Sequence, residues 1–156
     1  MASKKIRLSK EDAGVILDYH CALHKESALI LNISRKLVYT FRLENNDELR
    51  DLYEENLDEF GEISMLYSYR DIFDNLIDIF YAQKNRLPKN ELLEIKGLYE
   101  DYLKTFKSNV INYFNKLRSI KKDEPKLVKA ELEVLDSIEN MRFLTNRIIK
   151  LIDSKI

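Results

Sequence analysis

The sequence is poor in the residues that crosslink a chain or interrupt a helix. Its 156 residues include one cysteine, two prolines, three glycines and no tryptophan. A single cysteine excludes a disulfide within the chain and is compatible with a reducing compartment. Because proline and glycine are the strongest helix breakers, their scarcity favours long helices. We therefore predict an all-α protein and expect it in the cytoplasm.

Long apolar runs are missing as well. Short runs such as ALIL at 28–31 fall far below the ~18 apolar residues that a membrane-spanning helix needs. The first residues, MASKKIRLSKEDAG, include several basic side chains, but no apolar stretch follows them. We therefore expect neither a signal peptide nor insertion into a membrane.

The chain has no strong excess of either charge. It carries 26 basic and 27 acidic side chains, for a formal net charge of −1. No global field therefore draws it to nucleic acid, and a nucleic-acid partner is disfavoured although not excluded. The hydrophobic share of 45% is enough for one core in a chain of this length, so we predict a single helical-bundle domain over residues 1–156.

The first predicted helix begins near Ser9 and Asp12 and ends at about Arg42. Serine followed three residues later by an acid is a capping-box-like start, because the serine oxygen can accept an exposed backbone amide. Apolar residues then recur at helical spacing on one face, with charged residues opposite. The members of this face are Ile16, Tyr19, Leu23, Ile30, Leu37 and Phe41.

A second helix is predicted after the polar turn ENND at 44–47. Its apolar stripe over residues 49–67 points nearly opposite to the stripe over residues 69–80 on one continuous helical wheel. Either the helix is kinked near Gly61, since glycine weakens a helix, or an unbroken helix packs against different neighbours at its two ends. We favour one helix with a local disturbance near Gly61.

Two more helices follow, and each is signalled by a proline. Pro88 is expected in the first turn of the third helix, and Pro125 marks the start of the fourth. The third carries the clearest apolar stripe, at Leu92, Ile95, Tyr99, Tyr102, Phe106, Val110, Tyr113, Leu117 and Ile120; the fourth carries Leu127, Val134, Ile138, Met141, Leu144, Ile148 and Leu151. Four long helices with short connections predict an antiparallel up-down-up-down bundle. The alternative is an elongated pair of hairpins that completes its core by dimerising.

The stretch DYHCALHKE, residues 18–26, holds both histidines and the only cysteine. His20 and His24 are four residues apart and can share one helix face, a spacing compatible with a metal. Asp18 and Cys21 fall on the polar side of the same helix and cannot join them. No acid precedes either histidine by three residues, as the Glu-x-x-His motif of di-iron bundles requires. We therefore predict a buried His20 with a bonded ring nitrogen, a boundary His24 and a surface thiol, and assign no metal or cofactor.

Two charged segments are candidate interaction surfaces. The first is acidic, with Asp51, Glu54, Glu55, Asp58, Glu59 and Glu62 in the second predicted helix. The second is basic, with Lys104, Lys107, Lys116, Arg118, Lys121 and Lys122 interleaved with Tyr113 and Phe114. Runs of this kind most often form the solvated face of a helix. A basic partner for the first and a phosphate backbone for the second are the functional alternatives.

Residues 67–79, YSYRDIFDNLIDI, resemble a Y-x-R-D-(V/I)-(Y/F)-D-(H/N)-L segment in the cytosolic helical part of CorA-type magnesium transporters. The two membrane spans and the Gly-Met-Asn loop of that family are missing from this sequence. The resemblance therefore implies at most a similar helical packing unit, and no transport activity.

No constellation for catalysis is visible. The sequence has no Gly-rich phosphate loop, no GxSxG and no HExxH, so we predict that it is not an enzyme. Nine tyrosines and seven phenylalanines suit a core or a protein interface. We predict a non-enzymatic interaction or adaptor protein that binds another macromolecule or self-associates. The alternatives are a metal- or ligand-binding bundle using His20 and His24, and a nucleic-acid accessory protein using the basic third helix.

Overall fold

The computed structural model describes residues 5–43, 47, 51, 86–120 and 124–156. Three long helices dominate this part of the chain: α1 at Lys10–Leu43, α4 at Lys89–Ile120 and α5 at Pro125–Lys155. Two short strands, β1 at Lys5–Arg7 and β2 at Arg86–Pro88, form an antiparallel pair. The predicted helical character is confirmed for these residues, and the strand pair is a small addition that the apolar pattern did not predict.

The start of α1 is capped as its sequence predicts. The Asp12 amide donates a 3.0 Å hydrogen bond to the Ser9 hydroxyl, and the Ser9 amide donates at 3.4 Å to the Asp12 carboxylate. This reciprocal pair satisfies two of the amides that have no partner within the helix. The same carboxylate lies 2.9 Å from Lys155 Nζ, so the beginning of α1 is tied to the end of α5.

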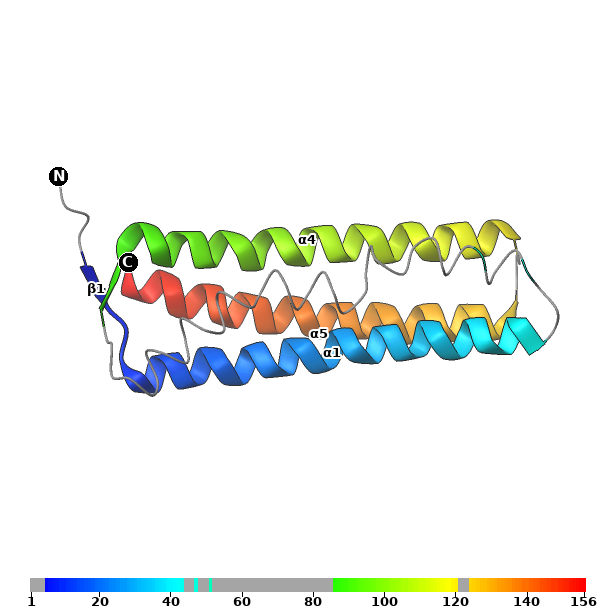
Figure 1. Ribbon diagram of the computed structural model, residues 1–156, viewed down its shortest axis with the longest axis horizontal. Helices are drawn as coiled ribbons and strands as arrows, with labels where there is room; N and C mark the ends of the chain where they lie inside the picture. The colour runs from blue at the N-terminus through cyan, green and yellow to red at the C-terminus, as the bar shows by residue number, and fades with distance from the viewer. Residues whose placement is uncertain (1–4, 44–46, 48–50, 52–85, 121–123) are drawn as a thin grey trace.

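The strand pair brings the starts of α1 and α4 together. Ile6 pairs with Leu87, and Lys5 pairs with Pro88, so α1 and α4 start at the same end of the molecule. The two helices run parallel from there, and α5 returns antiparallel to both (Figure 1). Pro88 was expected in the first turn of a helix, and this was wrong by one residue: it ends β2, and α4 begins at Lys89. A proline is tolerated at the end of a two-stranded pair because its position need not donate a ladder hydrogen bond.

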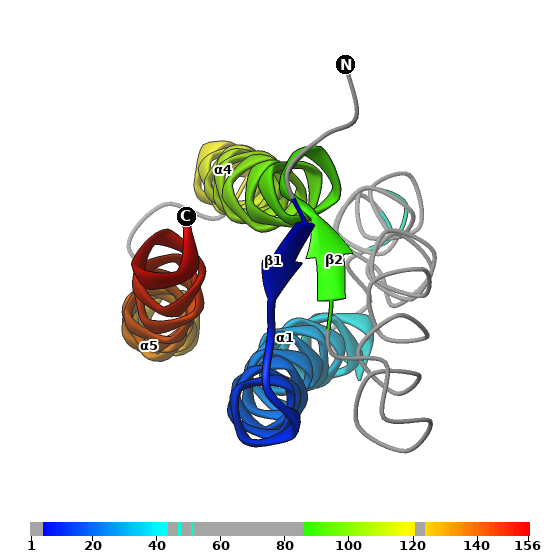
Figure 2. The same cartoon turned by 90° about the vertical axis from the view of Figure 1, so that its left-hand side faces the viewer.

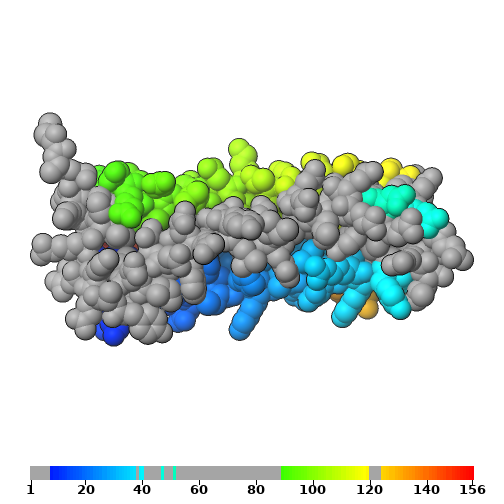
Figure 3. Space-filling model, in the orientation of Figure 1, coloured from blue at the N-terminus to red at the C-terminus, as the bar shows by residue number. Residues whose placement is uncertain are grey.

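The core lies between the three helices. Viewed along the helices, α5 lies next to both α1 and α4, while α1 and α4 lie diagonally opposite each other (Figure 2). Figure 3 shows the side chains of α4 and of α1 along the two long edges of one face. The largest fully buried side chains come from α4 and α1 and from Leu8, two residues before α1; they are Tyr99, Tyr113, Phe114, Leu8, Ile16, Leu23 and Ile30.

At four levels of the molecule, a buried side chain of α1 is matched by a larger buried side chain of α4. Buried positions of α1 recur every seven residues at Ala13, His20, Ser27 and Ser34, and those of α4 do so at Leu92, Tyr99, Phe106 and Tyr113. His20 bonds Tyr99 across a separation of 79 residues, and the same separation relates every other pair in the two sets. Because α1 and α4 are parallel, each small side chain of α1 is level with a larger one of α4. The aromatic rings can therefore fill the space between helices that lie diagonally.

Most predicted core positions in the three helices are confirmed. The buried members of the predicted stripes are Ile16, Leu23, Ile30 and Leu37 in α1, Leu92, Ile95, Tyr99, Tyr102, Phe106, Val110, Tyr113 and Leu117 in α4, and Leu127, Val134, Ile138, Met141 and Ile148 in α5. Tyr19, Leu144 and Leu151 are only partly buried against this core. Apart from Asp47 and Asp51, the predicted second helix lies outside the described residues, as do its disturbance near Gly61 and the segment 67–79. Among the described helices, none is long and apolar enough to cross a membrane.

Candidate functional site

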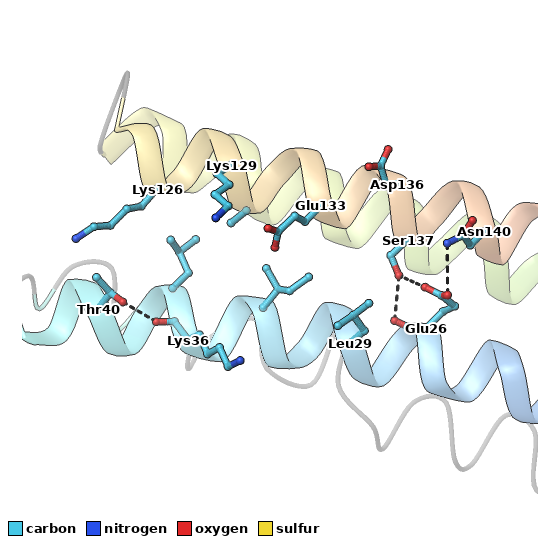
Figure 4. Close-up of a pocket in the computed structure, with 13 residues that line it drawn as sticks. Glu26, Leu29, Lys36, Thr40, Lys126, Lys129, Glu133, Asp136, Ser137 and Asn140 are labelled. Atoms are coloured by element: carbon cyan, nitrogen blue, oxygen red, sulfur yellow. Dashed lines mark hydrogen bonds between the residues drawn. The ribbon is translucent and has the colours of Figure 1, made fainter.

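A groove runs between α1 and α5, and we call it the α1/α5 groove (Figure 4). It encloses about 620 Å³ and is lined by Glu26, Leu29, Ile33, Lys36, Leu37, Thr40, Lys126, Lys129, Ala130, Glu133, Asp136, Ser137 and Asn140. Its floor is apolar, and Leu29 is 48% exposed there. An apolar floor between charged walls is typical of a surface that contacts a partner.

Glu26 is anchored at one side of this groove. The Ser137 hydroxyl contacts both the Glu26 carboxylate and the Glu26 backbone carbonyl, the latter at 3.3 Å. The Asn140 amide donates a 3.4 Å hydrogen bond to the other carboxylate oxygen (Figure 4). These bonds fix the register of α1 against α5, because they place residue 26 of one helix opposite residue 137 of the other.

The charges of the α1/α5 groove are separated along its length. Lys126 and Lys129 on α5 and Lys36 on α1 lie toward the end of the groove where α5 begins (Figure 4). Glu133 and Glu26 lie toward the middle of the molecule, together with Asp136, which α5 carries one turn farther on. The groove therefore has a basic end and an acidic end, with Leu29 and Ile33 between them.

A second groove lies on the other side of α5, between the end of α4 and the start of α5. This α4/α5 groove encloses about 670 Å³ and is lined by Asn115, Arg118, Ser119, Leu127, Val128, Glu131, Leu132 and Leu135. Arg118 reaches across its rim to Glu131 at 3.3 Å. Val128, Leu132 and Leu135 are 47%, 60% and 38% exposed.

The exposed residues of this second groove form a stripe that the sequence analysis missed. Val128, Leu132 and Leu135 follow one another at spacings of four and three, which places them on one face of α5 outside the buried face. The signal was present in the sequence as a second apolar stripe on the fourth helix. Farther along α5, Phe143 is 55% exposed, with the Arg147 guanidinium 4.9 Å from its ring centroid.

The residues of DYHCALHKE are distributed around α1 as predicted, except His24, which was expected at the boundary of the core. His20 is buried, whereas His24, Cys21 and Asp18 are exposed. His20 points toward α4, where its ring lies edge-on to the Tyr99 ring. Within the part of the chain that the structure describes, no three His, Cys, Asp or Glu side chains come close enough to hold a metal ion.

Burial controls the ionisation of the His20–Tyr99 pair. His20 Nδ1 and the Tyr99 hydroxyl are 3.0 Å apart in the core. Burial, and secondarily the nearby His24, lower the pKa of His20 from 6.5 to about 4. Burial, and secondarily Cys21, raise the pKa of the Tyr99 hydroxyl above its usual value. Both groups are therefore uncharged at neutral pH, so their hydrogen bond buries no charge in the core.

The structure describes more of the predicted basic surface than of the predicted acidic one. In the basic segment, Lys104, Lys107, Lys116 and Arg118 are exposed, but Tyr113 and Phe114 are buried in the core and cannot stack on bases. In the acidic segment, Asp51 is exposed, while the other five acids and the basic residues Lys121 and Lys122 lie outside the described residues.

Comparisons with known proteins found no relative of this chain. No protein-family model matches the chain, and searches of curated proteins and of solved structures found no significant match.

Proposed function

We propose that this chain is a non-enzymatic helical-bundle protein that works by binding another macromolecule. The observation that carries the proposal is the exposed stripe of Val128, Leu132 and Leu135 in the α4/α5 groove. Large apolar side chains that gather in a groove and stay open to water are characteristic of interaction surfaces. Their spacing suits an amphipathic helix of a protein partner, which would place its own apolar face in the groove.

The finer fold that we propose is an antiparallel four-helix bundle in which residues 47–85 supply the second helix. Two observations support it. α1 ends at the opposite end of the molecule from β2, so the chain between them has to return over the length of α1, about 50 Å at 1.5 Å per residue. A helix over 47–85 is long enough for this return. The diagonal placement of α1 and α4 is that of the first and third helices of such a bundle.

Two other functions receive less support. A metal or ligand site on His20 and His24 would need both rings in one place, but His20 is hydrogen-bonded in the core and His24 is exposed. Nucleic-acid binding by the third predicted helix would have to rely on its exposed lysines and Arg118, because the neighbouring aromatic rings are buried. We also propose a cytoplasmic location, because a sequence with a single cysteine is compatible with a reducing compartment.

Site-specific photocrosslinking in the native host tests the proposed function. A photoreactive residue at Leu132 should give one adduct of defined mass, and Leu135→Glu in the same chain should remove it. The matched control carries the photoreactive residue at Lys150, an exposed position of α5 outside the groove. The proposal fails if Leu132 gives no adduct, or if Lys150 gives the same adducts.

A further inference from the structure

The charge order of the α1/α5 groove is symmetric about one level of the molecule. On α5, residue 131 is the midpoint between Lys129 and Glu133, and it is also the midpoint between Lys126 and Asp136. Each pair joins a cation to an acid that lies at the same distance on the other side. A half-turn about an axis at this level therefore exchanges basic positions with acidic ones.

The α1 wall has the same symmetry at the same level. Residue 31 is the midpoint between Glu26 and Lys36 and between Leu29 and Ile33. Because Ser137 lies opposite Glu26 and the helices are antiparallel, residue 31 is level with residue 132 of α5. The midpoints of the two helices therefore agree to within one residue, or about 1.5 Å.

We propose that two copies of this chain associate through the α1/α5 groove, around a two-fold axis that lies in the interface and passes over both helices at this level. For two faces in contact, an axis that lies in the interface and perpendicular to the helices places α1 against the partner's α1 and α5 against the partner's α5, both antiparallel. A face of this kind must complement itself under the half-turn. The charges of this groove meet that condition.

The contacts of this arrangement follow from the two midpoints. Lys129 of each copy meets the Glu133 position of the other, and Lys36 meets the Glu26 position. At the axis, the exposed Leu29 side chain meets the Ile33 position of the other copy. The apolar residues are thus central, with cations facing acids on either side, which is the usual anatomy of a protein interface.

The alternative axis, parallel to the helices, gives no such match. It would leave every residue at its own level and place the basic end of one copy against the basic end of the other. Like charges opposed across an interface are unfavourable. The distribution of charge therefore selects the antiparallel arrangement.

The size of the interface indicates a reversible dimer. With the axis at residues 31 and 131, the helices overlap over residues 19–43 of α1 and 125–137 of α5. These lengths are about 37 Å and 20 Å, and helices about 10 Å wide would then bury about 1,100 Å² in total. That is at the lower end of specific interfaces. We therefore expect a dimer that dissociates on dilution and weakens as salt screens its ion pairs.

Charge reversal in complementary variants tests the dimer. The acidic variant carries Lys126→Glu and Lys129→Glu, and the basic variant carries Glu133→Lys and Asp136→Lys. By sedimentation equilibrium at low salt, each variant alone should self-associate at least about tenfold more weakly than wild type. An equimolar mixture should form a mixed dimer, because the acidic α5 wall of one variant then faces the basic α5 wall of the other.

The mixture separates an interface from an effect on folding. Charge reversal also changes the charges of neighbours within α5, such as Lys129 and Glu133 four residues apart, but mixing two chains cannot repair a change within one chain. Lys150→Glu and Asp101→Lys, at exposed positions away from the groove, are the matched controls and should dimerise as wild type does. A monomeric wild type, a variant that still dimerises, or a mixture that does not pair would each overturn the proposal.

Crosslinking provides a second measurement that leaves most of the charges in place. All chains for this experiment carry Cys21→Ser. A chain with Lys129→Cys and a chain with Glu133→Cys should form a mixed disulfide. This disulfide should form faster than the one between a Lys150→Cys chain and either of them. Equal rates would contradict the proposed register. The α4/α5 groove is on the other side of α5, so failure here leaves the proposed function standing, and failure of the photocrosslinking experiment leaves the dimer standing.

Discussion

His20 Nδ1 and the Tyr99 hydroxyl lie 3.0 Å apart in the core, between two parallel helices that are diagonal neighbours. Both side chains are nearly inaccessible to water, at 7% and 0% exposure. An inaccessible polar group has to find a partner within the protein, because leaving it unpaired costs free energy. This pair therefore specifies which turn of α1 faces which turn of α4.

We expect His20 to make the protein sensitive to acid. Its pKa is about 4 in the folded chain and 6.5 when unfolded, so the unfolded chain binds the proton more tightly. The contribution of the neutral ring to stability is complete above pH 6.5 and is lost as the pH falls toward 4, by on the order of 3 kcal/mol. Urea unfolding of wild type and His20→Gln between pH 7 and pH 4 measures it. The pH dependence should be much shallower in His20→Gln, whereas His24→Gln, which removes only the secondary cause of the lowered pKa, should keep most of it.

We expect Tyr99→Phe to destabilise the fold by about 1–2 kcal/mol, although it removes only one oxygen. The change keeps the ring and its packing but takes the hydroxyl from a buried histidine nitrogen, which then loses this partner. Urea unfolding at pH 7 gives the difference in free energy. Tyr39→Phe is the matched control, because Tyr39 is 63% exposed and should change stability by less than about 0.5 kcal/mol. Equal effects of the two substitutions would contradict a structural role for the hydroxyl.

We expect Ser9→Ala to lower stability by about 1 kcal/mol. The Ser9 hydroxyl accepts the Asp12 amide in the first turn of α1, and alanine cannot replace it. Ser154→Ala should have little effect, because the Ser154 hydroxyl only bonds a carbonyl one turn back at an exposed site. Thermal unfolding of the two variants provides the comparison. A stability loss in Ser154→Ala as large as in Ser9→Ala would mean that the cap is not the cause.

We expect Gly97→Ala to stabilise the protein by roughly 0.5–1 kcal/mol. Gly97 lies inside α4, and a Cβ atom added there meets nothing within 4 Å. Alanine restricts the unfolded chain and has a higher helix propensity than glycine. Thermal and urea unfolding should both show the gain. A loss of stability would show that the surface of α4 at Gly97 is covered in solution.

The sequence predicted the buried faces of the helices because apolar spacing depends only on local geometry. Ile16, Leu23 and Ile30 repeat every seven residues, and they are buried in α1. The start of α1 was also predictable, since the atoms that cap it are three residues apart. For α4 the predicted start was wrong by one residue, because Pro88 belongs to the strand pair, which depends on contacts distant in the sequence.

What periodicity could not predict is the partner of each face. The hydrogen bond of His20 was expected, but Tyr99 as its partner was not, because the two residues are 79 positions apart and nothing in the local pattern relates them. The two grooves beside α5 depend in the same way on which helices become neighbours. Val128, Leu132 and Leu135 were visible as apolar residues, but only the packed structure shows that they remain exposed.

The pairing of Ile6 with Leu87 has a consequence for the order of folding. This contact closes a loop of most of the first half of the chain, whereas α4 and α5 are joined by only four residues, 121–124. Closing a long loop costs more conformational entropy, and contacts of high sequence separation form slowly. We expect the α4–α5 hairpin to form first and α1 to dock on it later. In pulsed hydrogen exchange during refolding, amides of α4 and α5 should gain protection before those of α1.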